Sequence, residues 1–482
     1  MDHGYYKQDG TGKCEVNQMQ KSVLRNSLVL LGFALLTFTS LATLAFGADQ
    51  MGPLRAGAAR VDISPPKQMF PIGAFIDVHD PLYARALVLD NGLSKVVLMS
   101  VDAGGVPNGD EVAKAVAEEL GIPASHVSMS ATHDHSTPNS PGGGRGYDLA
   151  PYNAMMRKGI LEAARQANAK LQPARIGFGT GKAYINTNRD EKIGEVYHMG
   201  YSPEGPTDKT VAVIKVTTAS GDPIAVWSNY AVHGVVMFLS RTKDGHPEIS
   251  GDIGGATATY VEDRMKGAIA LWTPGAAGDQ NPLFMSTYNQ DAPDVHDEGE
   301  AGWAILDVQG RRLGEEVVRV SNSIQNTADR VVLWGANSTI VCPGRKPDPS
   351  APPTAAAAPA APNGAVASPT AGQDRRVKMV DGDPVTIPLE LVMINDIALA
   401  NVGGEVFNEI SQKLKQQSLF DRTAMVTLSP GSIGYIPSEK SYLLPSQMAV
   451  NNHIRPGCAE QSIVNGFLDL EKQYIPVWKA AR

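Results

Sequence analysis

The sequence predicts an α/β protein of the mixed α+β kind, with mixed β-sheets flanked by helices in one large domain. Short apolar runs alternate with amphipathic stretches along the body of the chain. The chain has 482 residues and is 43% hydrophobic, so it can bury a substantial core. Turn signals typical of hairpins separate some of the runs, which favours antiparallel pairs beside parallel ones.

Strands are predicted where apolar residues follow one another, and helices where they recur with helical spacing. The predicted strands are 84–89, 95–101, 126–131, 210–216, 224–230, 268–272 and the runs within 385–402. The predicted helices are 111–120, 152–171, 255–265, 301–325 and 459–471. The alternation of the two kinds of element supports the fold class.

Residues 1–48 have the pattern of a targeting segment. Lys21 and Arg25 precede a charge-free, mostly apolar stretch from Leu28 to Phe46, and small residues follow at Gly47-Ala48. This pattern predicts a signal peptide, with an uncleaved membrane anchor as the alternative because the apolar stretch is long. In both cases the body, 49–482, is expected to be exported to a periplasmic or extracellular location.

A low-complexity segment interrupts the body. Between Ser350 and Gly372 the chain consists mostly of Ala, Pro, Thr, Ser and Gly, and it contains no charged or aromatic residue. Such a composition cannot form a packed core, so a disordered insertion is predicted at 344–376. A domain boundary is the alternative, but strand-like runs resume at Val385, which favours one body with an inserted loop.

Charge and cysteine content restrict the partners and the compartment. The formal net charge is −8 and the body contains no basic run, which argues against a nucleic-acid partner and favours a neutral or uncharged substrate. The N-terminal segment is the candidate membrane contact. Beyond the leader only Cys342 and Cys458 remain, so either one disulfide or two free buried thiols are expected.

Two histidines form the strongest local signal. His133 and His135 follow the apolar run at 126–131 and precede a glycine-rich loop. Strand ends that open into loops are where α/β sheets carry their chemistry, so both rings are expected to face one cavity. The spacing indicates a metal site, and two solvated loop histidines are the alternative.

Three further residues occupy similar junctions. His233 follows the run at 224–230 and precedes a glycine, Glu405 follows Gly403-Gly404, and Tyr435 follows Gly434. Taken singly, each has an ordinary explanation: a hydrogen-bonded structural histidine, a glutamate in the first turn of a helix, and a packed tyrosine.

Seven motifs taken together resemble one family. They occur in order at 56–66, 131–136, 188–189, 229–234, 278–282, 403–405 and 434–437. The set resembles the N-terminal catalytic domain of the neutral/alkaline non-lysosomal ceramidases, over about residues 55–480. The resemblance implies a zinc-dependent amidohydrolase that cleaves the N-acyl amide bond of ceramide-like or other N-acyl lipids.

The resemblance also implies a ligand set and catalytic roles. The zinc ligands it implies are His133, His233, Glu405 and Tyr435, with Tyr442 as a second candidate for the tyrosine. It places His135 and Arg189 next to the scissile amide, where Arg189 would hold the developing oxyanion and His135 would carry protons to the departing amine. Without the resemblance, Arg189 would be interpreted as a surface ion-pair residue.

The motif at Gly278-Asp279-Gln280-Asn281-Pro282 departs from the family pattern. Family members have Gly-Asp-Val-Ser-Pro-Asn, so Asn281 stands where a serine with an assigned catalytic role would lie. Asn281 cannot act as a nucleophile but can donate a hydrogen bond to substrate, and a water-based mechanism remains open. Asp279 is expected either to orient a histidine ring or to form an Asx turn.

The chain also stops at Arg482, where well-known ceramidases continue into a C-terminal β-sandwich. The resemblance therefore describes a divergent member without that accessory domain, and the substrate is less defined than the reaction. Two alternatives follow: a non-catalytic lipid- or glycan-binding protein on the same fold, and a metal-dependent esterase.

Overall fold

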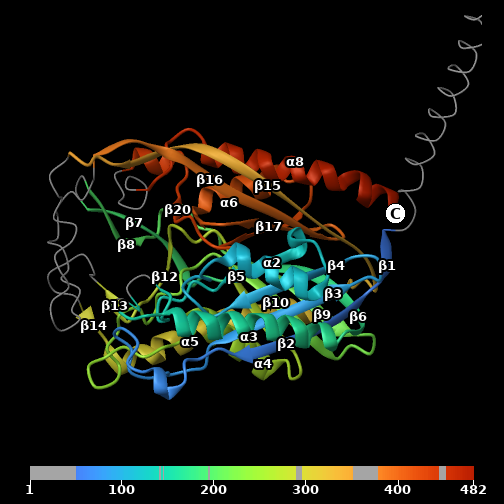
Figure 1. Ribbon diagram of the computed structural model, residues 1–482, viewed down its shortest axis with the longest axis horizontal. Coiled ribbons are helices and arrows are strands. Elements are labelled where there is room, and N and C mark those ends of the chain that lie inside the picture. Colours follow the sequence, from blue (N-terminus) through green and yellow to red (C-terminus); the bar gives the residue numbers. More distant parts are fainter. Residues whose placement is uncertain are drawn as a thin grey trace, which may run out of the picture. The chain divides into compact units, whose positions relative to one another are not determined.

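An eight-stranded mixed sheet forms the larger part of the framework (Figure 1). The computed structural model describes residues 50–140, 143–144, 146–193, 196–288, 296–350, 378–444 and 452–482. The strand order is β11 (Ile269–Pro274), β10 (Pro223–Tyr230), β9 (Thr210–Thr218), β6 (Gln172–Lys182), β2 (Arg55–Asp62), β3 (Tyr83–Asp90), β4 (Lys95–Val101) and β5 (Val127–Ala131). Only the outer pairs β10–β11 and β4–β5 are parallel in this sheet.

A five-stranded sheet packs on one face of the larger one. Its order is β1 (Met51–Pro53), β15 (Arg330–Pro347), β16 (Met379–Ile394), β17 (Ile397–Val402) and β19 (Arg422–Thr427). One apolar cluster joins the facing sides of the two sheets, for example Leu87, Leu98, Trp227, Val392 and Leu399. Because both sheets bury this face, their relative position is set by close packing.

Short strand pairs complete the sheet structure around the ends of these two sheets. They are β12 (Gln280–Pro282), β7 (Asn186–Ile193) and β8 (Val196–Ser202) in a three-stranded sheet, β13 (Thr287–Tyr288) with β14 (His296–Asp297), and β18 (Glu405–Val406) with β20 (Tyr435–Ile436).

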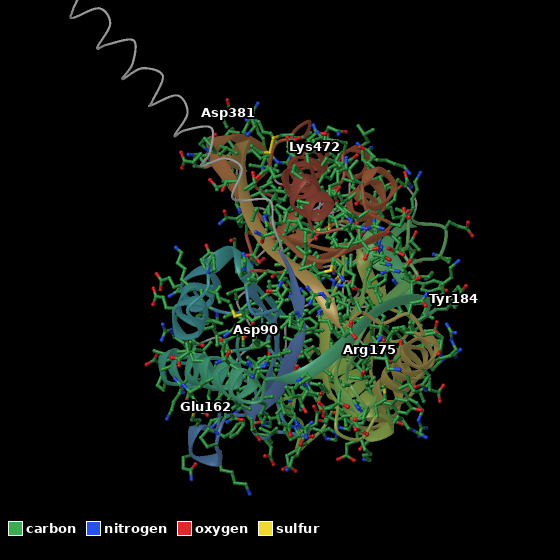
Figure 2. The ribbon with its side chains drawn as sticks, turned by 90° about the vertical axis from the view of Figure 1, so that its right-hand side faces the viewer. Asp90, Glu162, Arg175, Tyr184, Asp381 and Lys472 are labelled. Carbon is green, nitrogen blue, oxygen red and sulfur yellow. A yellow bond between two sulfur atoms is a disulfide. The ribbon has the colours of Figure 1, made fainter. Side chains whose placement is uncertain are left out.

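Helices cover the outer faces of both sheets. The eight-stranded sheet carries α2 (Gly109–Leu120) and α3 (Ala150–Ala169) on one half, and α4 (Asp252–Arg264) and α5 (Gly302–Ser323) on the other. The five-stranded sheet is covered by α8 (Ala459–Ala480), and α6 (Asn408–Gln417) packs against α8. Figure 2 shows the layers from the side, with Lys472 on α8 and Arg175 on β6. Short 3₁₀ turns lie at Lys67–Met69, Ala124–His126, Gly299–Ala301 and Lys440–Leu443.

The observed elements confirm the predicted fold class. Residues 50–480 form one compact unit, and the predicted strands and helices lie within a few residues of their expected bounds. The differences are α8, which continues past 471 to Ala480, and several longer elements that were not predicted: β2, β6, β7, β8, β15, β19 and α6. β2 and β6 contain several glycine or alanine residues, whose short side chains give little apolar signal.

Several other predictions concern the ends and the insertion. β15 continues to Pro347 because its backbone pairs with β16, so the predicted start of the insertion at 344 is wrong, while 351–377 lie outside the described residues. The leader, 1–48, also lies outside them. Cys342 and Cys458 form a disulfide with a Cα–Cα distance of 5.7 Å, which confirms the first of the two expectations for these residues. Among the described helices, none combines the length and apolarity needed to span a bilayer.

Candidate active site

Three histidines lie together where two parallel strand pairs end. His133 and His135 follow β5, and His233 follows β10. The backbone N–H of His135 donates to the carbonyl of Gly234 at 2.8 Å, and Asp134 and Gly234 form a β-bridge. A Cβ at residue 234 would come within 2.7 Å of the Asp134 carboxylate, so this close approach requires glycine. The two histidine-bearing loops are therefore fixed to each other by their main chains.

The side chains of these histidines converge on one carboxylate. Nε2 of His133 lies 3.2 Å from Oε2 of Glu405, and Nε2 of His233 lies 3.3 Å from the same oxygen. Nε2 of His135 lies 3.3 Å from Nε2 of His133. The ligating atoms of the three histidines are all within 4.8 Å of one another, which is the spacing expected around one metal ion.

The protonation of two rings follows from their outer hydrogen bonds. Nδ1 of His133 lies 2.9 Å from the carbonyl of Gly104, and Nδ1 of His233 lies 2.7 Å from that of Ala277. A carbonyl can only accept, so Nδ1 of each ring donates. When either ring is neutral its proton is therefore on Nδ1, and Nε2 directs a lone pair toward Glu405. Nε2 of His233 and Oε2 of Glu405 are buried and have no well-directed hydrogen bond. Two lone pairs and an anionic oxygen aimed at one point fit a divalent cation.

The backbone at His133 is strained in a way that suits this role. Its φ is 62°, in the left-handed region that residues other than glycine rarely adopt. Such strain persists where the surroundings fix the conformation, and it is concentrated at functional sites. Here the left-handed residue turns the imidazole into the group of ligating atoms while the chain continues to His135.

Glu405 and Tyr435 reach the site from the side of the five-stranded sheet. Glu405 begins β18 and Tyr435 begins β20, and the two residues are paired in register. The N–H of Glu405 donates to the carbonyl of Gly434 at 2.9 Å, and Gly434 itself has a φ of 86°. Residues opposite each other on paired strands project from the same face, so the carboxylate and the phenol lie side by side.

The charges in the site are mutually adjusted. Burial alone would raise the pKa of Glu405, but His133 and His233 hold it well below its usual range, so this carboxylate is ionised. Burial, followed by the neighbouring rings of His133 and His233, lowers the pKa of His135 well below its usual value, so His135 is neutral at pH 7. Burial raises the pKa of Tyr435 to about 12, despite the nearby guanidinium of Arg189.

Arg189 is buried beside the carboxylate and the phenol. It lies in β7 with 3% of its surface exposed, and its guanidinium carbon is 5.2 Å from the centre of the Tyr435 ring. Nη2 donates to the carbonyl of Gly278 at 2.5 Å, and Nη1 lies 3.4 Å from Oδ1 of Asn281. A buried guanidinium held by carbonyl oxygens keeps its positive charge in the site, so Arg189 is not a surface ion-pair residue.

Asp279 occupies a different position from either expectation. Its carboxylate accepts hydrogen bonds from the N–H of Asn408 at 2.8 Å and from Nδ2 of Asn188 at 2.9 Å, and these partners are not histidine rings. The His233 ring is instead oriented by the carbonyls of Ala277 and Gln280, from the same segment. Asp279 thus ties the start of α6, next to Glu405, to the strand that carries Arg189.

Two other predicted positions can be placed. Asn281 lies in β12, between Arg189 and the sulfur of Met285, whose Sδ is 3.6 Å from Nδ2 of Asn281. The hydroxyl of Tyr442 donates to Asn452 and Ile454, at 3.1 Å in each case, so the second candidate for the tyrosine ligand is directed elsewhere.

Sequence reasoning missed one group that supports the site. Asp252, the first residue of α4, is 1% exposed and accepts the N–H groups of Val236 and Met237, just beyond His233. An aspartate at a helix start has many ordinary explanations, so the sequence offered no signal for this contact.

Comparisons with known proteins point to one family. Residues 76–293 match the family described as neutral/alkaline non-lysosomal ceramidase, N-terminal. The neutral ceramidase of Pseudomonas aeruginosa is 26% identical over 226 residues, which span 42% of this chain and 32% of that protein. The aligned region is therefore about a third of the relative's length.

Two solved structures share the fold. One, described as a ceramidase complexed with C2, superposes with a TM-score of 0.66 at 17% identity, covering 87% of this chain and 76% of the other. The crystal structure of neutral ceramidase from Pseudomonas aeruginosa gives a TM-score of 0.65 at 16% identity, covering 87% and 75%.

Proposed function

Because residues 76–293 belong to the neutral/alkaline non-lysosomal ceramidase family, as the ordered motifs predicted, we propose that the protein is a zinc-dependent amidohydrolase. Its proposed reaction is cleavage of the N-acyl amide bond of ceramide-like or other N-acyl lipids. The observation that carries the proposal is the convergence of the bare Nε2 atoms of His133 and His233 on the Glu405 carboxylate.

The donor set supports zinc as the resident metal. Two imidazole nitrogens, one carboxylate and an adjacent phenol, Tyr435, are ligands that zinc accepts, and the described ligand group contains no thiolate. His135 is a further nitrogen in the same group. A zinc ion held there supplies the Lewis acidity that activates water and polarises a carbonyl.

The surrounding residues supply the remaining chemistry. Arg189 keeps a buried positive charge beside Glu405 and Tyr435, where it stabilises negative charge that develops on the carbonyl oxygen of the substrate. His135 is neutral and half-buried, so its imidazole accepts a proton from water and delivers it to the departing amine. Asn281 offers an amide donor near Arg189 in place of a hydroxyl.

Metal content and hydrolysis measured on the same preparations test this proposal. Wild-type protein is expected to contain about one zinc ion per chain by elemental analysis and to release fatty acid from a fluorescent N-acyl sphingosine. His133→Ala is expected to lose both, and His246→Ala, which alters an exposed histidine in a turn, is the matched control. Full activity of metal-free His133→Ala would overturn the assignment of the site.

The same proposal includes the setting of the enzyme. An exported protein with a lipid-like or small amide substrate, and no nucleic-acid partner, fits the leader pattern and the net charge of −8. Intact mass of the protein recovered from the culture medium or periplasm, compared with the mass of the full chain, tests both export and cleavage of residues 1–48.

A further inference from the structure

The turn that follows His233 has an unusual backbone. Leu239 has a φ of 59°, and a leucine in the left-handed region is uncommon because its Cβ crowds the backbone. Strain of this kind is retained only where contacts on both sides fix the chain.

Asp252 is one of the groups that fix this turn. Oδ1 accepts the N–H of Val236 at 3.1 Å, and Oδ2 accepts the N–H of Met237 at 2.9 Å. Asp252 is 1% exposed and has a φ of 44°, so the clamp itself is built into a strained helix start. The turn is therefore held from α4, independently of the histidines.

The fixed turn presents one aromatic side chain to the active site. The Phe238 ring meets the His135 ring edge to face, with centroids 5.1 Å apart and an interplanar angle of 83°. Phe238 is only partly buried, so part of its ring remains accessible beside the imidazole. Neither the metal ligands nor Arg189 requires an apolar group at this place.

A second segment, residues 284–287, brings the side chain of Met285 close to the turn. Three hydrogen bonds of 2.7 Å join it to the turn: the N–H of Ser286 to the carbonyl of Val236, the hydroxyl pair of Ser240 and Ser286, and the Thr287 hydroxyl to the carbonyl of Phe238. Met285, next to this seam, contacts Asn281 and is partly buried. Its neighbour Phe284 is 65% exposed.

Apolar side chains thus lie beside both His135 and Asn281. We infer that Phe238 and Met285 form the surface that receives a hydrocarbon chain of the substrate next to the scissile amide, and that Phe238 sets the preference for chain length. The inference rests on the amidohydrolase function proposed above and adds the residues that select the substrate. Burial of methylene groups against these side chains favours long-chain substrates over short ones.

Two substrate series test this inference and identify which chain is bound. One series varies the acyl group from acetyl to palmitoyl on a constant amine, and the other varies the amine from ethyl to hexadecyl on a constant acyl group. Phe238→Ala is expected to lower the long-to-short ratio of kcat/KM in one series by roughly tenfold or more, and Phe238→Leu to restore most of it. The series that responds assigns the contact to the acyl or the amine side.

Binding provides a readout that does not depend on turnover. Calorimetric titration of the metal-loaded protein with palmitate and with hexadecylamine is expected to show roughly tenfold weaker binding of one of them to Phe238→Ala. If wild-type protein binds one of these chains but hydrolyses no amide, the proposed function fails while the apolar surface stands. Leu93→Ala, which alters a residue 62% exposed in the turn between β3 and β4, is the control.

Three results would overturn the inference. The first is an equal loss on long and short members of both series, which would give Phe238 only a role in supporting His135. The second is loss of zinc from Phe238→Leu as well as Phe238→Ala, which would make the residue structural. The third is unchanged ratios and unchanged binding of both probes in Phe238→Ala.

Discussion

The two large sheets contribute different chemistry to the site. Loops after β5 and β10 of the eight-stranded sheet supply three imidazoles. Carbonyl oxygens orient the rings of His133 and His233, and the backbone of His135 is tied to Gly234. The side of the five-stranded sheet supplies oxygen groups, the side chains of Glu405 and Tyr435, through the short pair β18–β20. The proposed ligand set takes groups from both sides. The apolar packing between the sheets therefore fixes how these groups are placed, and metal affinity should report how well the two halves are docked.

Removal of the carboxylate that comes from the side of the five-stranded sheet should have the largest effect on zinc binding and activity. Glu405→Gln keeps the side-chain shape but replaces the anion on which His133 and His233 converge. We expect zinc occupancy to fall steeply, and kcat/KM for amide hydrolysis to fall about a thousandfold, which corresponds to about 4 kcal/mol.

Elemental analysis and fatty-acid release check this prediction together. Glu118→Gln, an exposed residue of α2, is the control. Retention of both zinc and activity by Glu405→Gln would show that the imidazole half binds the metal alone, and the comparison between the two halves would then fail.

Arg189→Lys tests whether the site needs only the positive charge of Arg189 or also its planar guanidinium group. Lysine keeps the positive charge but loses the planar group that donates to Gly278 and lies beside the Tyr435 ring. We expect kcat/KM to fall about a hundredfold with zinc content preserved, since oxyanion stabilisation depends on placement of the donor. Loss of zinc in this variant would instead show that Arg189 holds the ligands in position.

The fold could be predicted from the sequence to a considerable extent because buried strands carry their own signal. Val96, Val97, Leu98 and Met99 are fully or almost fully buried in β4, and that continuous apolar run predicts a strand by itself. The end of β15 and the start of β16 are largely exposed or half-buried and contain glycine and proline, so the full length of these strands is set by their pairing with each other. Pairing between distant strands, and the stacking of the two sheets, leaves no local pattern.

Less of the site than of the fold could be predicted from the sequence around each residue. His133 and His135 could be recognised from their spacing at a strand end, but the local surroundings of His233, Glu405 and Tyr435 each left an ordinary explanation open. Their convergence was implied only by the ordered family motifs, because it depends on contacts of Glu405 with histidines that lie more than a hundred positions away in the sequence. Asp252 and the carbonyls of Ala277 and Gly278 act through backbone contacts, which residue types do not reveal.

Asp279 bridges the two halves and should make their docking depend on pH. Burial raises its pKa to about 7, above the usual value of 3.8 for an unfolded chain. Between pH 3.8 and about 7, the Asp279 carboxyl is protonated in the folded state and ionised in the unfolded state. The contribution of this carboxyl to the free energy of unfolding is therefore fully present at low pH and is lost as the pH rises toward 7. Asp279→Asn imitates the protonated form and removes this dependence.

At each pH, the free energy of unfolding of Asp279→Asn is compared with that of wild type. We expect this difference to shift in favour of the variant by about 2 kcal/mol from pH 5 to pH 8. Urea unfolding of the metal-free proteins at both pH values checks this, with Asp307→Asn, which changes a side chain 72% exposed on α5, as the control. A constant difference at the two pH values would show that Asp279 does not titrate in this range.

The smallest effect is expected at Asn281, which lies on β12 of the three-stranded sheet. Its Oδ1 is 3.4 Å from Nη1 of Arg189, a long contact, and Nδ2 faces the weakly accepting sulfur of Met285. If water activated at the site is the nucleophile, a hydroxyl at this position adds no essential group, so Asn281→Ser should change kcat/KM by less than about tenfold.

Two results would contradict this prediction: a burst of acyl-enzyme in the serine variant, or a much larger gain in rate. Either would mean that a serine at this position acts as a nucleophile, and that water activated by the proposed metal site does not account for hydrolysis alone. Steady-state and pre-steady-state rates on one N-acyl sphingosine substrate distinguish these outcomes, because only a covalent intermediate produces a burst ahead of turnover.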